Sequence, residues 1–303
     1  MNWSLRYLQK KWFDLTRNDR DFEEQWYLRF CVSDQAVPHC QQQWFDIMPP
    51  DDRFYADPFV VADQGRYFIF FEEYQYANPI GYLSVTEVFT DGRYTPPQAI
   101  LKQPYHLSYP NVFWHQDAWY MLPETHQNKT IELWRATDFP YQWQKHQVLM
   151  DNIDAADTTP FFDGTHWYLF TAIKQNCKKF GNRLDIFYAD DLFSTDWQAH
   201  ARNPVKVGLL HDRPAGQLFY HQGQLIRPVQ DSIRRYGGGM ELRVVDMLSP
   251  TDFSEHLLCQ ISAPHTANFD GIHTLNYAAP ILVTDALRNL PRHLILSPVQ
   301  PLP

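Results

Sequence analysis

The stretch DTTPFFDGTHWYLF, at residues 157–170, decides the fold class because it holds two short apolar strands separated by a polar turn. Asp163 and Gly164 at that turn are typical of a β-hairpin. Three other stretches have the same form and begin at Asp57, Tyr109 and Ala215: DPFVVADQGRYFIFFEE, YPNVFWHQDAWYMLPET and AGQLFYHQGQLIRPVQD. Their starts recur about every 50 residues, a period typical of repeat architectures.

A repeat of this length with several short strands per unit predicts an all-β chain that forms a five-bladed β-propeller. We expect the propeller over residues 21–303, preceded by an N-terminal extension at residues 1–20 with a short amphipathic helix. GIHTLNYAAPILVTDAL and RHLILSPV supply a fifth unit, and the early strand EEQWYLRFCV is expected to close the ring against it, since closure removes an open sheet edge. A β-sandwich is the alternative, but the regular recurrence favours the propeller.

Composition excludes several classes of protein. The formal net charge of −9 over 303 residues argues against a nucleic-acid partner. There is no signal-peptide pattern at the N-terminus and no apolar run near the roughly 20 residues that span a bilayer, so we expect no transmembrane segment. Four scattered cysteines, without metal-site spacing, favour free thiols in a reducing compartment over two disulfides, which predicts a cytoplasmic protein: Cys31, Cys40, Cys177 and Cys259.

The repeats also place polar residues together. In a propeller the innermost strands of all blades begin at one mouth of the central channel, where this pattern puts Asp57 and Asp157, while Glu124 ends a second strand. Converging carboxylates are the usual equipment of glycoside cleavage, so these three are the catalytic candidates. The substrate-binding candidates are Glu72, His106, Tyr109, His126, Arg213, Arg227, Gln230, Asp231, Tyr236 and His273.

Each candidate also has a structural interpretation. Asp57 and Asp157 could cap turns at the strand entries. Arg213 and Arg227 could form structural ion pairs with Glu72 and Glu124, and His273 could be a core histidine with its hydrogen bonds satisfied. The convergence of the repeats carries the argument for a site, not any single residue.

Several motifs together resemble a known family: YADPFVV, FFEE, HLSYPNVF, YMLPET, LWRATDFPYQW, DTTPFFDGTHWYLF, RPAGQLF, RPVQD and GIHTLN. They are similar to the propeller domain at the N-terminus of plant glucosamine inositolphosphorylceramide transferases, over roughly residues 50–280. That domain is in turn similar to five-bladed glycoside hydrolases, namely arabinanases, β-xylosidases and invertases. The resemblance implies a carbohydrate-active protein of glycan or glycolipid assembly.

The resemblance to the hydrolases carries over only in part. It implies that Asp57, before Pro58, is a general base. Tyr109 stands where those enzymes have a carboxylate that tunes the acid, and Asp157 stands near their general acid but shifted and shortened. His273 is similar to a histidine that holds a calcium ion in the channel through water, so that ion is compatible with the sequence; otherwise no cofactor is expected.

Two functions follow. The first is a glycosidase or transglycosidase, with Asp57 as base and Asp157 or Glu124 as acid, whose arginines and histidines indicate an acidic or phosphorylated sugar. The second is a non-catalytic glycan-binding module that presents an acceptor to a glycosyltransferase, which the incomplete acid and base set supports. The sequence favours catalysis, because a channel lined with unpaired carboxylates is costly to build for packing alone. A protein-interaction propeller is disfavoured, since the WD signature is absent.

Overall fold

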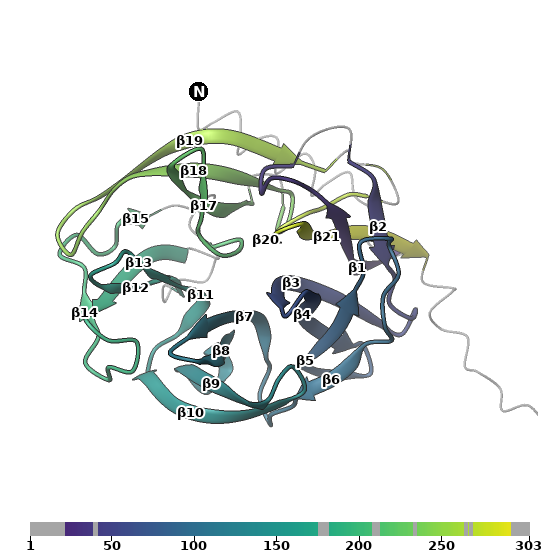
Figure 1. Cartoon of the computed structure of the whole chain (residues 1–303), viewed down its shortest axis with the longest axis horizontal. Helices are drawn as coiled ribbons and strands as arrows, with labels where there is room; N and C mark the ends of the chain where they lie inside the picture. Colours follow the sequence, from purple (N-terminus) through teal and green to yellow (C-terminus); the bar gives the residue numbers. More distant parts are fainter. Residues whose placement is uncertain are drawn as a thin grey trace, which may run out of the picture.

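A computed structural model describes residues 22–38, 42–174, 182–207, 213–232, 235–263, 266 and 269–291. Five sheets surround a central axis, which confirms the predicted five-bladed propeller (Figure 1). Within these ranges there is one 3-10 turn, η1 (His126–Asn128), and no α-helix. The predicted N-terminal extension and the RHLILSPV segment lie outside the described residues.

The first four blades each run outward along the chain, from an innermost strand at the channel to an outermost strand at the rim. Blade one consists of β3 (Arg53–Asp63), β4 (Arg66–Gln75), β5 (Asn78–Val88) and β6 (Gln98–Leu101). Blade two consists of β7 (Ser108–His115), β8 (Ala118–Glu124), β9 (Thr130–Asp138) and β10 (Gln142–Asp151). Blade three consists of β11 (Ala155–Phe162), β12 (Trp167–Lys174), β13 (Asn182–Ala189) and β14 (Gln198–Ala199), with β15 (Lys206–Val207) also paired to β13. Blade four consists of β16 (Phe219–His221), β17 (Gln224–Asp231), β18 (Gly239–Leu248) and β19 (Phe253–Ser262).

The fifth blade joins the two ends of the chain. Its strands are β20 (Leu275–Ala278), β21 (Ile281–Pro291), β1 (Phe22–Val32) and β2 (Trp44–Ile47). Strand β1 pairs antiparallel with β21 along its whole length, which confirms the predicted closure by the early strand. Leu28 and Phe30 of β1 are fully buried in the resulting core. Burial of such a side chain contributes roughly 1.5–3 kcal/mol, so the closing contact is a substantial source of stability.

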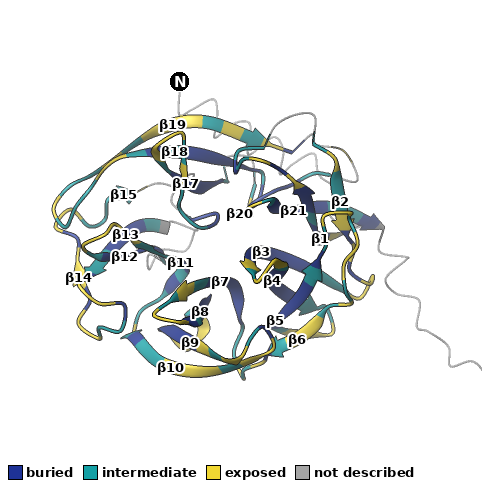
Figure 2. Ribbon diagram, viewed as in Figure 1, coloured by how far each residue is buried: buried dark blue, intermediate teal, exposed yellow. Residues whose placement is uncertain are grey.

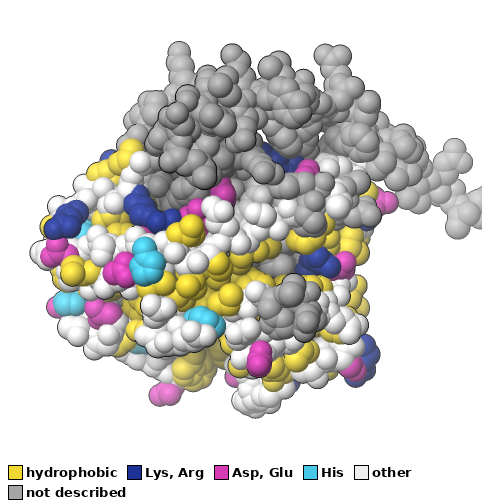
Figure 3. Space-filling view, turned by 90° about the horizontal axis from the view of Figure 1, so that it is seen from above, with side chains coloured by type: hydrophobic (Ala, Val, Ile, Leu, Met, Phe, Trp, Pro, Cys, Tyr) yellow, Lys and Arg dark blue, Asp and Glu magenta, His cyan; other side chains and the backbone are white. Residues whose placement is uncertain are grey.

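Apolar side chains fill the spaces between neighbouring blades, and the exposed residues gather on the outer strands and turns (Figure 2). For example, Leu122 of β8 and Leu169 of β12 are fully buried in one cluster between blades two and three. On the described part of the face in Figure 3, Lys and Arg side chains are interspersed with Asp and Glu instead of forming a basic patch.

Two further sequence predictions concern compartment and membrane. None of the described residues forms a helix with the length and apolar character needed to cross a bilayer. Cys31 and Cys259 are free thiols, while Cys40 and Cys177 lie outside the described residues. The reducing compartment and the cytoplasmic location therefore stay predictions.

Candidate functional site

The innermost strands of blades one to three share a backbone irregularity near their starts. Strand pairing shifts between Ala56 and Phe59 in blade one, and Asp57 within this bulge has a left-handed backbone, with φ of 52°. Tyr109 (φ 46°) and Asp157 (φ 53°) occupy the same place in blades two and three. Such a conformation costs an L-residue on the order of 1 kcal/mol, and strained positions of this kind gather at functional sites.

The register shows how the three strand starts correspond. Asp157 stands at the place of Asp57, Thr158 takes the place of Pro58, and Pro160 lies two residues further along β11. The aspartate remains shorter than the glutamate of the hydrolases named above. Tyr109 fills the second-blade position, as the sequence predicted.

Asp157 forms an ion pair with Arg213 that uses both carboxylate oxygens. Arg213 Nε lies 2.6 Å from Oδ2, and its Nη2 lies 2.9 Å from Oδ1. Gln230 Nε2 donates a third hydrogen bond to Oδ2, at 3.1 Å. Only 1% of Asp157 is exposed. Burial raises the pKa of Asp157 well above its ordinary value; the Arg213 guanidinium opposes this shift, while the nearby Glu124 carboxylate adds to it.

Glu124, at the end of β8, lies beside this pair. Its Oε2 accepts the backbone N–H of Asp157 at 3.1 Å, and its Oε1 is 2.6 Å from Nδ1 of His126. Burial acts to raise the pKa of Glu124, but the hydrogen bond from His126 and the charge of Arg213 outweigh it and lower the pKa to about 2. Glu124 is therefore ionised at neutral pH, with both oxygens engaged.

A second cluster centres on His273, whose ring lies between two carboxylates. Its Nδ1 is 2.6 Å from Asp285 Oδ2, and its Nε2 is 3.4 Å from Asp57 Oδ1. Thr274 Oγ1 donates to the same oxygen of Asp57, at 2.9 Å. Burial acts to lower the pKa of His273, but Asp285 and Asp57 outweigh it and raise it to about 9; burial also raises the pKa of Asp57 to about 6, against the charge of His273.

The same cluster is a candidate cation site. Asp57, His273 and Asp285 offer ligand atoms within 4.8 Å of one another. Asp285, however, already accepts the backbone N–H groups of Asp57, His273 and Thr274 in addition to its ion pair with the His273 ring. The His273 ring lies between both carboxylates, so a directly bound cation would have to displace the ring proton and these contacts. The water-mediated calcium ion stays a prediction.

Blade one carries a third carboxylate–histidine pair. His106 Nε2 lies 3.1 Å from Glu72 Oε1, and the backbone N–H of Gly81 donates to His106 Nδ1 at 3.0 Å. A β-carbon on Gly81 would lie 2.6 Å from His106 Cε1, so only glycine permits this approach. Burial acts to lower the pKa of His106, and the Glu72 carboxylate outweighs it, so that the pKa is raised.

Tyr236 connects the two halves of the site. Its ring centroid lies 5.4 Å from Arg213 Cζ and 5.3 Å from the ring of His273. Asp157 and Asp57 therefore face the same mouth through their partners Arg213 and His273. Tyr236 is 51% exposed, which leaves part of its ring open to solvent at the rim.

The structure places other candidates elsewhere. Arg227 was expected to bind sugar or to pair with Glu72 or Glu124, but it is fully buried and forms a two-point ion pair with Glu255 of β19. It lies three residues from Gln230 on β17, so its side chain leaves the opposite face of the strand. Asp231, half-buried, follows Gln230 at the strand end.

Tyr109 lies at the channel, but its hydroxyl group is engaged in hydrogen bonds within the fold. Its hydroxyl accepts the backbone N–H of Gly216 at 2.7 Å and shares a hydrogen bond with Thr159 Oγ1 at 2.9 Å. It thus joins blades two, three and four below the mouth.

The expectation that the channel carboxylates are unpaired is wrong. Each of them has a cationic or histidine partner: Asp57, Glu72, Glu124 and Asp157.

Sequence reasoning missed Asp285, Thr274 and Trp26. Asp285 organises the His273 cluster, and Trp26 of β1 stacks on the His273 ring with centroids 4.2 Å apart. A carboxylate inside the apolar run ILVTDAL was the available signal for Asp285. Nothing in the sequence pointed to Trp26, because its role depends on the closing strand.

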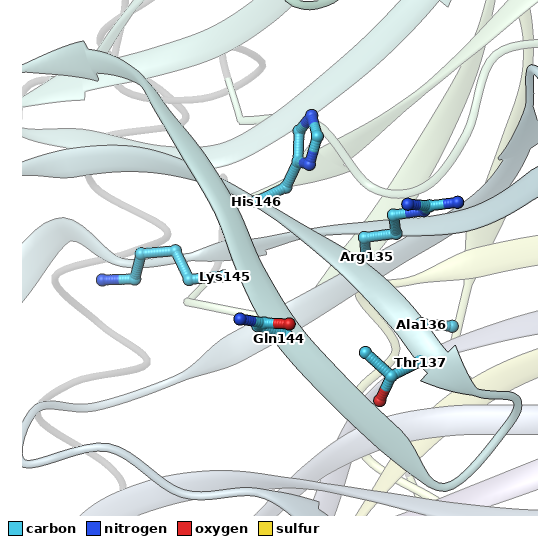
Figure 4. A pocket seen from close by; sticks show the side chains of 6 residues that line it. All are labelled: Arg135, Ala136, Thr137, Gln144, Lys145 and His146. Atoms are coloured by element: carbon cyan, nitrogen blue, oxygen red, sulfur yellow. The ribbon is translucent and has the colours of Figure 1, made fainter.

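A separate hollow of about 460 Å³ lies on the outer strands β9 and β10 of blade two (Figure 4). It is lined by Arg135, Ala136, Thr137, Gln144, Lys145 and His146. The side chains of Lys145 and His146 point in different directions, and Lys145 is already paired with Glu132. The hollow lies on the outer strands of blade two, away from the channel, and its side chains do not converge on a common point.

A sequence model of the family "Glucosamine inositolphosphorylceramide transferase 1, N-terminal" matches residues 36–272. The chain belongs to this family. It is 30% identical over 205 residues to glucosamine inositolphosphorylceramide transferase 1 of Oryza sativa subsp. japonica, and 27% identical over 205 residues to that of Arabidopsis thaliana. Each match covers 67% of this chain and 27% of the relative, so the chain spans about a quarter of the length of these transferases.

Solved structures support the fold of this family member. Zg3597, a family 117 glycoside hydrolase of Zobellia galactanivorans, aligns with a TM-score of 0.55 at 10% identity and covers 87% of this chain and 90% of that one. An α-L-arabinofuranosidase from Lactobacillus brevis aligns with a TM-score of 0.55 at 13% identity, covering 80% and 91%. At these identities the likeness establishes a glycoside hydrolase-like propeller fold and no activity.

Proposed function

We propose that this propeller binds a glycan at the channel mouth without cleaving it, and presents it to a glycosyltransferase. The observation that supports this most directly is the engagement of the candidate acids. Asp157 is held by Arg213 and Gln230, and Glu124 by His126 and the Asp157 backbone. A general acid must deliver its proton to the leaving oxygen, and neither carboxyl has a free oxygen to do so.

The rim favours a ligand rich in hydrogen-bond acceptors. The partly exposed groups are the donors, with side-chain exposures of 30% for His126, 24% for Arg213 and 18% for His106. The carboxylates behind them are buried. Such a rim is suited to a phosphate or carboxylate carried by a sugar, and the half-exposed ring of Tyr236 offers a stacking surface for the sugar itself.

Family membership supports the link to glycan assembly. The relatives are named as transferases and are far longer than this chain, so a propeller of this kind is one part of a larger machinery there. We extend this role to the present chain, with a glycosyltransferase as partner.

Calorimetry with a panel of phosphorylated and uronic-acid oligosaccharides tests the proposal. We expect binding by the wild-type protein that is lost in His126→Gln and weakened about tenfold in Tyr236→Leu, while Tyr236→Phe, which keeps the ring, binds as wild type. Equal binding by all four proteins would place the ligand elsewhere and contradict the proposal.

Hydrolysis is the second candidate, and one observation favours it. Burial raises the pKa of Asp57 to about 6, which is suited to a general base near neutral pH. Release of new reducing ends from any glycan of the panel by wild-type protein, and its loss in Asp57→Asn, would establish hydrolysis in place of simple binding.

A further inference from the structure

Three exposed aromatic side chains lie at the mouth of the channel opposite the candidate site. The innermost strands begin at the site and end in hairpin turns at the other mouth, where Trp114, Phe162 and Tyr220 stand next to or one residue before the turn. Their exposed fractions are 54%, 46% and 67%. Large aromatic surfaces left in water usually have a function.

The three residues occupy one register position in successive blades. Trp114 pairs across its hairpin with Trp119, Phe162 with Trp167 and Tyr220 with Leu225. The same position holds Ala62 in blade one and Tyr277 in blade five. The exposed rings therefore form an arc over blades two, three and four, which we call the aromatic arc: Trp114, Phe162 and Tyr220.

Ring contacts hold the arc in place from behind. Trp114 contacts Trp119 edge-on at 5.3 Å, and Phe162 contacts Trp167 at 5.3 Å. Tyr220 of blade four lies 6.5 Å from Phe161 of blade three, so it contacts the blade that carries Phe162. A surface of fixed rings loses little conformational entropy when a ligand stacks on it.

We propose that the aromatic arc is a second glycan-binding surface, which takes an extended, uncharged oligosaccharide. Charge selects this occupant: the turns beside the arc at residues 115–117, 163–166 and 221–223 contain no Lys or Arg, while Asp117 and Asp163 are exposed there. These turns therefore offer no Lys or Arg side chain to an anionic membrane or nucleic acid.

The neighbours of the rings also favour a sugar chain over an apolar partner. Gln116 and Gln222 are exposed in the same turns, so both amide and carboxylate groups lie in the turns beside the rings. Sugar hydroxyls bind such groups while the apolar ring faces stack on aromatic side chains. One ring per blade provides several stacking positions for consecutive sugar residues. This surface is remote from the candidate site and does not depend on the proposed function.

Affinity electrophoresis through gels that contain arabinan, xyloglucan, galactomannan or mixed-linkage β-glucan tests the proposal. We expect at least one of these neutral polysaccharides to retard the wild-type protein, and Tyr220→Ala to raise the apparent dissociation constant about fivefold or more. Trp114→Ala combined with Tyr220→Ala should abolish retardation. Tyr94→Ala is the matched control, since Tyr94 is 40% exposed but lies on the outer part of blade one.

Near-ultraviolet circular dichroism checks that each variant is folded. If the double variant is unfolded, the single variant Tyr220→Ala tests the proposal, because Tyr220 is the most exposed of the three residues. Retardation by none of the four polysaccharides, or equal retardation of wild type and Tyr220→Ala, would overturn the proposal. So would arc-dependent dimerisation in sedimentation or arc-dependent binding to phosphatidylcholine vesicles, because these would assign the arc to a second copy or to a lipid surface.

Discussion

Arg213 and Asp157 face each other across two short hydrogen bonds, of 2.6 and 2.9 Å, between the loop that begins blade four and the innermost strand of blade three. The same guanidinium lies 3.5 Å from Glu124 Oε2 in blade two. The Arg213 guanidinium thus connects the carboxylates of blades two and three to the start of blade four. The pair is both a structural clasp and the centre of the binding site that we propose.

Breaking this clasp should destabilise the fold. Asp157→Ala removes the acceptor of the hydrogen bonds from Arg213 and Gln230, and because that arginine side chain is 24% exposed, water relieves part of the cost. We expect a loss of about 2 kcal/mol in the free energy of unfolding, measured by urea denaturation. Asp190→Ala, at a carboxylate that is 92% exposed, is the control and should change little. Equal stability of the two variants would show that the clasp contributes nothing.

Stability should depend on the protonation of His273. Its pKa in the folded state is about 9, above the value of about 6.5 for an unfolded histidine. The charged ring therefore stabilises the fold fully below pH 6.5, and this contribution is lost as the pH rises through about 9. Asp57, with a pKa of about 6, titrates mostly below this window.

We expect the free energy of unfolding of the wild type to fall by on the order of 2 kcal/mol between pH 6.5 and 9.5, and the slope to be much smaller in His273→Gln. Chemical denaturation at a series of pH values measures both. Parallel profiles for the two proteins would contradict a charged His273 between Asp57 and Asp285.

Gly81→Ala should damage the site more than the fold. The new methyl group would lie 2.6 Å from His106 Cε1 and 2.8 Å from Glu72 Oε1, so the histidine must move away from its carboxylate. We expect ligand affinity to fall about tenfold, as in His106→Gln, with a small change in melting temperature. Calorimetry and thermal denaturation of the two variants measure these effects, and unchanged affinity in both would remove His106 from the site.

Ring closure should dominate stability. Phe30 of β1 is fully buried between the closing strands and blade one. Phe30→Ala should cost about 3–5 kcal/mol, while Val32→Ala, at a residue on the same strand that is 44% exposed, should cost far less. Urea denaturation compares them. A small effect of Phe30→Ala would mean that the ring stays closed without this contact.

The sequence predicted the repeat and its consequences well, for physical reasons that particular residues illustrate. Each hairpin is encoded locally by alternating apolar residues and a turn such as Asp163-Gly164, so blade number and closure follow from counting. Asp57 and Asp157 could be placed at one mouth because equivalent strand starts converge in any propeller.

The partners of those residues could not be predicted in the same way. Arg227 lies three residues before Gln230 in the motif RPVQD, and the two-residue alternation of a strand turns its side chain to the other face, so the two do not share a site. Trp26 approaches His273 only when the ring closes, because more than 240 residues separate the two, while Asp285 reaches His273 from strand β21, 12 residues further along the chain. Asp57 pairs with His273 more than 200 residues away and Asp157 with Arg213 56 residues away, whereas Glu124 pairs with His126 only two residues further along the chain.

Saturation-transfer NMR on a mixture of phosphorylated and uronic-acid oligosaccharides distinguishes binding at the channel mouth from cleavage, because one sample reports both. We expect transfer from wild-type protein to sugar protons, its weakening in Tyr236→Leu but not in Tyr236→Phe, and no new reducing-end signals on prolonged incubation. New anomeric signals that vanish in Asp57→Asn, or the absence of transfer to any sugar of the mixture, would contradict binding without cleavage.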